Sequence, residues 1–99
     1  MTFEEHAQRA LDEVPEELAE HLRNVAIVVE DENSEEPDLY GLFDEPEYLP
    51  AKVTIYRLPL EADFPEPERL EHEIRVTVLH ELAHYFGMDE QRIADLGYH

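Results

Sequence analysis

Apolar residues recur at two different periods along the chain, and the longer period predicts helices. In residues 2–13, apolar side chains return every three or four positions, which is the spacing of one helix face. Thr2 is placed to cap this helix, and Glu5, three residues later, completes the pattern of a capping box. Residues 15–24 (PEELAEHLRN) predict a second short helix with Pro15 in its first turn.

Three shorter segments have the composition or the alternation of β-strands. Residues 25–30 (VAIVVE) form a β-branched run of strand length, and residues 39–43 (LYGLF) predict a second short strand. In residues 51–58 (AKVTIYRL), apolar and polar positions alternate, which is typical of a strand that is buried on one face. Residues 31–38 and 44–50 are polar or rich in turn formers and are expected to be loops.

A proline-rich connector leads from the last strand into a long apolar segment. Pro67 suits the first turn of a helix and Gly87 suits its end, so we expect one helix over residues 67–86. Apolar residues lie on nearly every side of this helix, which predicts that it is the buried centre of its domain. A turn and a short helical piece are expected in residues 87–99.

The order of these elements predicts the fold class and the number of domains. Two helices, three strands and a long helix indicate an α+β domain, with a small mixed or antiparallel sheet packed on the long central helix. A chain of 99 residues suits one compact domain, so we expect a single domain over residues 1–99.

The formal net charge of −19 changes the picture by excluding classes of partner. Nucleic acids and anionic membrane surfaces are not expected as partners, because both require clustered Lys and Arg. No apolar run approaches the roughly 20 residues of a membrane span, and the acidic N-terminus lacks the apolar stretch of a signal peptide. Together with the absence of cysteine, this favours a cytoplasmic location and leaves His, Asp and Glu as the available metal ligands.

The candidate chemistry lies in the segment HELAHYFGMDE, on the predicted long helix. His80 and His84 are four residues apart, so on a helix their imidazoles lie one above the other and can meet one metal ion. Glu81 points about 100° away from His80, beside that ion, where it can take a proton from a bound water. Two imidazole ligands and one general base on a rigid turn are typical of HExxH metalloproteases. Zinc (Zn²⁺) suits such ligands.

The residues after this motif favour the same interpretation. Gly87 stands three residues after His84, where a helix can end in a left-handed conformation. Asp89 and Glu90 follow at once, and the turn can bring either of them back towards the metal. His99, at the end of the chain, is a further candidate for the site.

The segment is similar to the extended zincin signature HExxHxxGxx(H/D), and with its flanking residues it resembles the small bacterial minimal zincin metallopeptidase-like proteins. The resemblance implies zinc ligands at His80 and His84, a base at Glu81, and a third ligand at Glu90. It also implies a zincin-like α+β core whose edge strand pairs with an extended peptide. Metzincins carry His or Asp at the third-ligand position, where this sequence has Glu90. They also have a methionine turn further along the chain, and no Met follows Glu90 in this sequence. Asp89 therefore remains the alternative third ligand.

Two function classes follow, and both imply an extended peptide or protein as partner. The first is a zinc-dependent metallopeptidase that hydrolyses peptide bonds with water activated by Glu81. The second is a catalytically weak, zinc-stabilised module that binds a peptide or a protein. A third interpretation, an acidic decoy for basic proteins, would predict binding that weakens steeply with salt and does not depend on the histidines.

Overall fold

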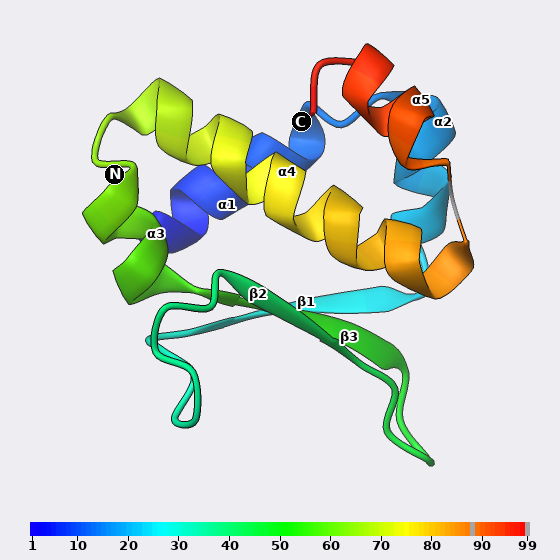
Figure 1. The fold of residues 1–99 in the computed structure, drawn as a ribbon, viewed down its shortest axis with the longest axis horizontal. Coiled ribbons are helices and arrows are strands. Elements are labelled where there is room, and N and C mark those ends of the chain that lie inside the picture. Colours follow the sequence, from blue (N-terminus) through cyan, green and yellow to red (C-terminus); the bar gives the residue numbers. More distant parts are fainter. Residues whose placement is uncertain (88, 99) are drawn as a thin grey trace.

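A computed structural model describes residues 1–87 and 89–98, which form a three-stranded sheet with helices on one of its faces (Figure 1). The elements, in chain order, are α1 (Phe3–Asp12), α2 (Glu16–Ala19), the 3₁₀ helix η1 (Glu20–Leu22), β1 (Val25–Glu30), β2 (Gly41–Asp44), β3 (Ala51–Tyr56), α3 (Arg57–Asp63), α4 (Pro67–Phe86) and α5 (Glu90–Asp95). None of the helices in these described ranges is long and apolar enough to cross a membrane.

The sheet is mixed, one of the two arrangements that the sequence predicts. β3 lies in the centre, pairs in parallel with β1 and pairs antiparallel with β2. β2 is therefore an edge strand, with one side of its backbone free of a strand partner in the described part of the chain.

One face of the sheet packs against the helices and forms the core. Ile27, Val53 and Phe43 point to this face, and α4 crosses it with α1 beside α4 (Figure 1). The cluster contains the fully buried residues Val53, Ile55, Leu60, Ile74, Val78 and Leu82. α4 contributes Leu70, Ile74, Val78 and Leu82 to this core, as expected of the central helix of the domain. Its last turn is nevertheless open to solvent, and Tyr85 and Phe86 are each 43% exposed.

Most helix ends agree with the sequence prediction. Thr2 and Glu5 form the expected capping box at the start of α1. α4 begins at Pro67 and ends at Phe86, and Gly87 adopts the left-handed conformation with φ 63°. The second predicted helix is shorter, because its later residues form η1, and Pro15 is its N-cap and not a first-turn residue.

The segment after β3 differs from the prediction. The strand expected over residues 51–58 ends at Tyr56, and α3 occupies part of the expected connector. Pro59 fits inside α3 because it is the third helical residue, and the first backbone N–H groups of a helix have no intrahelical acceptor. Leu60 anchors this helix in the core, where it is fully buried.

Gly41 is the point where β2 comes closest to α4. A β carbon at this position would lie 2.5 Å from Cγ2 of Thr77 and 3.3 Å from the backbone oxygen of Thr54. The Thr77 side chain has little freedom to move, because its hydroxyl donates to the backbone oxygen of Glu73 at 2.8 Å. Glycine at this position therefore lets the edge strand lie against the helix one turn before His80.

We expect Gly41→Ala to destabilise the protein by about 1–3 kcal/mol, the usual cost of overpacking a tight contact. Thermal unfolding followed by circular dichroism measures this effect. The double variant Gly41→Ala/Thr77→Ser should recover most of the loss, because serine lacks the clashing methyl group and keeps the hydroxyl. A double variant as unstable as Gly41→Ala would show that the Thr77 methyl is not the cause.

Candidate metal and catalytic site

The three residues of the HExxH motif lie on the last turns of α4, beside the edge strand. His80 and Glu81 are partly buried, whereas the side chain of His84 is 73% exposed. The helical spacing that the sequence predicts is present, because α4 runs without a break from Pro67 to Phe86. The three side chains have different partners.

The carboxylate of Glu81 contacts the backbone of β2. Its Oε1 accepts a hydrogen bond from the backbone N–H of Phe43 at 2.9 Å, across 38 positions of sequence. The backbone N–H of Tyr56 donates to the backbone oxygen of Tyr40, so the polar backbone groups of Tyr40 face β3. Along an antiparallel strand, successive residues direct these groups alternately towards and away from the partner strand. The N–H groups of Gly41 and Phe43 therefore point away from β3. Glu81 therefore occupies a donor on the free edge of the sheet, where an extended peptide would pair.

The imidazole of His80 is bound by the end of the chain. Its Nε2 donates to the backbone oxygen of Tyr98 at 3.1 Å, so in the neutral ring the proton is on Nε2. The segment after α5 is brought back over α4 by a turn in which the N–H of Tyr98 donates to the oxygen of Ile93. Metal binding through Nε2 requires this contact to His80 to open.

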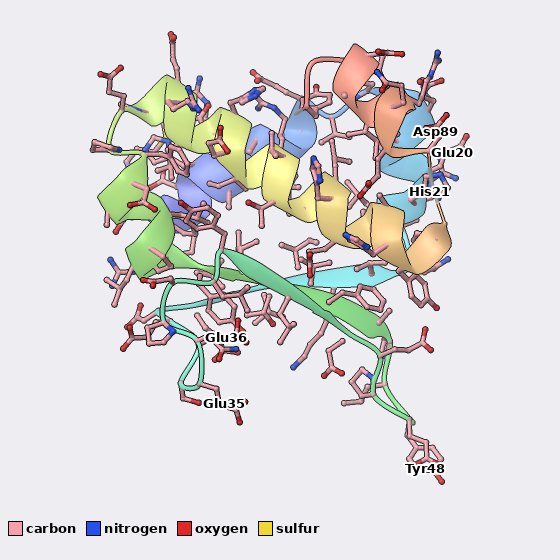
Figure 2. The ribbon with its side chains drawn as sticks, viewed as in Figure 1. Glu20, His21, Glu35, Glu36, Tyr48 and Asp89 are labelled. Carbon is pink, nitrogen blue, oxygen red and sulfur yellow. The ribbon has the colours of Figure 1, made fainter. Side chains whose placement is uncertain are left out.

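His84 faces Glu90 across the turn at Gly87. Nε2 of His84 and Oε1 of Glu90 are 3.7 Å apart, and both side chains are exposed. Asp89 has a different role, because it is the N-cap of α5 and accepts from the N–H of Gln91 at 2.9 Å (Figure 2). The carboxylate of Glu90 thus faces His84, whereas that of Asp89 is held by the backbone of α5.

The donor chemistry of His80, His84 and Glu90 suits zinc, which is bound in proteins by imidazole and carboxylate groups. The arrangement is incomplete, since within residues 1–87 and 89–98 no three His, Asp or Glu side chains are grouped closely enough to hold a metal ion. The assignment of the three ligands stays a prediction. His99 lies outside the described residues.

A cavity of about 330 Å³ lies next to Glu81, between β2 and α4. Leu39, Tyr40 and Val76 supply much of its wall, which is mainly apolar. The hydroxyl of Tyr40 donates to the carboxylate of Asp63, and this hydrogen bond raises the pKa of Tyr40 to about 12. Sequence reasoning missed this cavity, because it depends on the packing of β2 against α4.

A tyrosine hydroxyl can donate to a developing oxyanion, but the hydroxyls of Tyr56 and Tyr85 are bound to other groups. Tyr56 is on the far face of the sheet, where its hydroxyl accepts from Nδ2 of Asn33 at 3.0 Å, so it cannot reach the motif. The hydroxyl of Tyr85 donates to Glu45, which raises the pKa of Tyr85. Tyr98 contributes its backbone oxygen to His80.

Comparison with known proteins adds a family relationship to this geometry. The family model described as zincin-like metallopeptidase matches residues 22–98, which include the sheet, α4 and α5. No curated protein matches the chain.

Proposed function

The chain belongs to the zincin-like metallopeptidases, and from this premise we propose that it hydrolyses peptide bonds with a zinc ion held at the end of α4. Family membership indicates a function of the metallopeptidase type. The observation that carries the proposal further is the position of Glu81. Its carboxylate lies at the free edge of β2, hydrogen-bonded to Phe43 and one residue from His80 on the same helix.

In this proposal His80, His84 and Glu90 would hold the zinc ion. When bound, zinc polarises a carbonyl group and lowers the pKa of water to about 7. The helix supplies a rigid frame for the two imidazoles, and Glu90, the first residue of α5, supplies the carboxylate.

The other roles belong to Glu81 and the edge strand. The outward-facing backbone groups of Gly41 and Phe43 orient an extended peptide along β2. Glu81 exchanges its hydrogen bond with Phe43 for a proton taken from the attacking water, and it later delivers that proton to the leaving amine. The apolar cavity beside Glu81 receives a side chain of the peptide and excludes water from the reacting bond.

A second candidate function is a zinc-stabilised module that binds a peptide without cleaving it. The hydrogen bond of Glu81 to the N–H of Phe43 favours this alternative, because Glu81 must leave that partner before it can act as a base, whereas a binding module needs no base. The two functions share the peptide site and differ in turnover.

Peptide hydrolysis measured before and after metal removal tests the proposal. We expect the purified chain to cleave members of a mixed peptide library, to lose this activity with a chelator and to regain it with zinc, as mass spectrometry of the products would show. Zinc-dependent peptide binding without cleavage would select the binding module. If zinc affects neither binding nor cleavage, both functions are wrong.

A further inference from the structure

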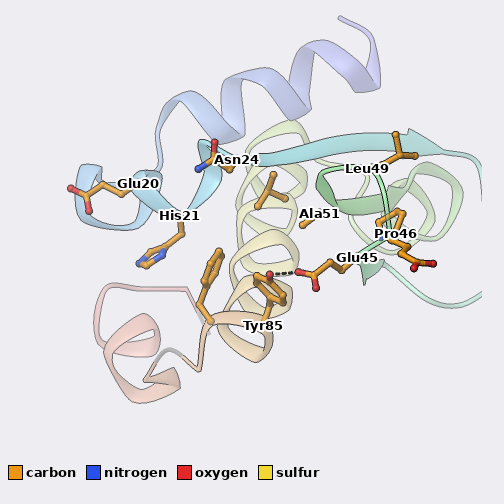
Figure 3. A pocket seen from close by; sticks show the side chains of 11 residues that line it. Glu20, His21, Asn24, Glu45, Pro46, Leu49, Ala51 and Tyr85 are labelled. Carbon is orange, nitrogen blue, oxygen red and sulfur yellow. Dashed lines mark hydrogen bonds between the residues drawn. The ribbon is translucent and has the colours of Figure 1, made fainter.

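A hollow of about 510 Å³ lies at the C-terminal end of α4, one helical turn beyond Glu81. Residues of η1 form one of its walls, and the segment between β2 and β3 forms the other. Figure 3 shows His21 on the first side, Glu45 on the second, and Tyr85 of α4 hydrogen-bonded to Glu45. The roles proposed for the motif residues do not account for this hollow.

Two aromatic residues of α4, Tyr85 and Phe86, are among the residues that line the hollow. The rings of Phe43 and Tyr85 are stacked with centroids 4.2 Å apart, and Tyr85 meets Phe86 edge to face at 4.6 Å. Phe86 in turn lies 5.0 Å from the ring of His21. Tyr85 and Phe86 remain 43% exposed, so a continuous aromatic surface faces solvent and is available to a ligand.

The rim of the hollow is acidic. Glu20, Glu45 and Glu47 line it, and its described lining contains no Lys or Arg. The hydroxyl of Tyr85 donates to Glu45, which places a carboxylate beside the aromatic residues of the hollow (Figure 3). Aromatic faces attract a guanidinium or ammonium group, and carboxylates bind the same group through charge-assisted hydrogen bonds.

The charge of the chain decides which occupant fits. A second copy of this protein carries −19 and would be repelled from an acidic hollow, as would a nucleic acid. Phe43 connects the hollow to the proposed peptide path, because its N–H donates to Glu81 and its ring stacks on Tyr85, which lines the hollow.

We propose that this hollow binds an arginine or lysine side chain of the extended peptide on which the Glu81 site acts, and this inference rests on the proposed function. Glu81 and Tyr85 are four residues apart on α4, which corresponds to about 6 Å along the helix. An extended peptide advances about 3.3 Å per residue, so the basic residue lies about two positions from the bond that is cleaved. The hollow thereby makes the site selective for basic peptides.

Fluorescence anisotropy with the zinc-loaded Glu81→Gln chain tests the selectivity without turnover. The probes are short labelled peptides with one arginine at successive positions, and matched peptides with neutral citrulline in its place. We expect citrulline to weaken binding about tenfold at the best position, which is the combined effect of a partly exposed ion pair and a cation–π contact.

Two double variants, each of which removes two negative charges, test whether the discrimination between arginine and citrulline peptides arises in the hollow. Glu45→Gln/Glu47→Gln should abolish most of the discrimination, and the glutamine at position 45 keeps an oxygen that accepts from Tyr85. Glu35→Gln/Glu36→Gln removes two charges from a loop on the other side of the sheet (Figure 2) and should keep the discrimination. Equal binding of both peptides, or equal effects of the two double variants, would overturn the inference.

The outcomes separate this inference from the proposed function. If the unmodified chain cleaves the arginine and citrulline peptides with equal kcat/KM, the hollow is not a specificity site although the protein is a peptidase. If arginine-selective binding is found without any cleavage, the hollow binds basic side chains although the peptidase function is wrong.

Discussion

Glu81→Gln is expected to lower kcat for peptide hydrolysis by at least about 100-fold, the lower range of general acid–base catalysis. Glutamine has nearly the same size, and its amide oxygen can still accept from the N–H of Phe43. It cannot take a proton from water at neutral pH. Zinc affinity and thermal stability should therefore stay close to those of the unmodified chain.

A control at the other end of the same helix isolates the role of position 81. Glu68 is exposed in the first turn of α4, so Glu68→Gln makes the same change in charge far from the motif and should leave kcat unchanged. A Glu81→Gln variant that cleaves peptides at the normal rate would rule out Glu81 as the base.

Glu90→Ala is expected to weaken zinc binding by at least about tenfold, since even residues that only orient metal ligands change affinity by that amount. Oε1 of Glu90 lies 3.7 Å from Nε2 of His84. Its side chain is exposed, so its removal should have little effect on the stability of the metal-free chain. Titration of zinc against a competing chelator measures the change.

The matched control is Asp89→Asn, and Asp89→Ala would be unsuitable. Asp89 caps α5, and alanine at an N-cap costs about 1 kcal/mol and would disturb the helix that carries Glu90. Asparagine keeps the cap and removes the charge. If Asp89→Asn weakened zinc binding and Glu90→Ala did not, the third ligand would be Asp89.

Local features of the fold could be predicted from the sequence because they depend on neighbouring residues. The start of α1 could be predicted from Thr2 and Glu5, and the two ends of α4 from Pro67 and Gly87. The backbone groups at a helix end lack partners within the helix, so the residues next to them determine where the helix begins and ends. α3 was missed because Pro59 suggests a break, although the first turn of a helix tolerates proline. The pairing of β1 with β3 joins strands separated in sequence, and periodicity carries no information on such pairing.

In the candidate site, too, the local arrangement could be predicted from the sequence and the contacts between distant segments could not. The spacing of His80, Glu81 and His84 predicts their positions on one helix, and α4 is that helix. The contact of Glu81 with Phe43 and the contact of His80 with Tyr98 arise from packing between distant segments. No sequence pattern indicates either contact. In the proposed function, the contact of Glu81 must open before Glu81 can act as a base, and the contact of His80 must open before its Nε2 can bind metal.

Titration of zinc into the chelator-treated chain, with and without His84→Ala, is the most direct test of the proposed zinc site. His84 is 73% exposed, so alanine at this position should leave the metal-free fold intact, which circular dichroism would verify. We expect about one zinc ion per unmodified chain, the stoichiometry of a single catalytic-type site, and a loss of most of that affinity in His84→Ala. An unmodified chain that binds no zinc, or a His84→Ala chain that binds it equally well, would contradict the proposed site.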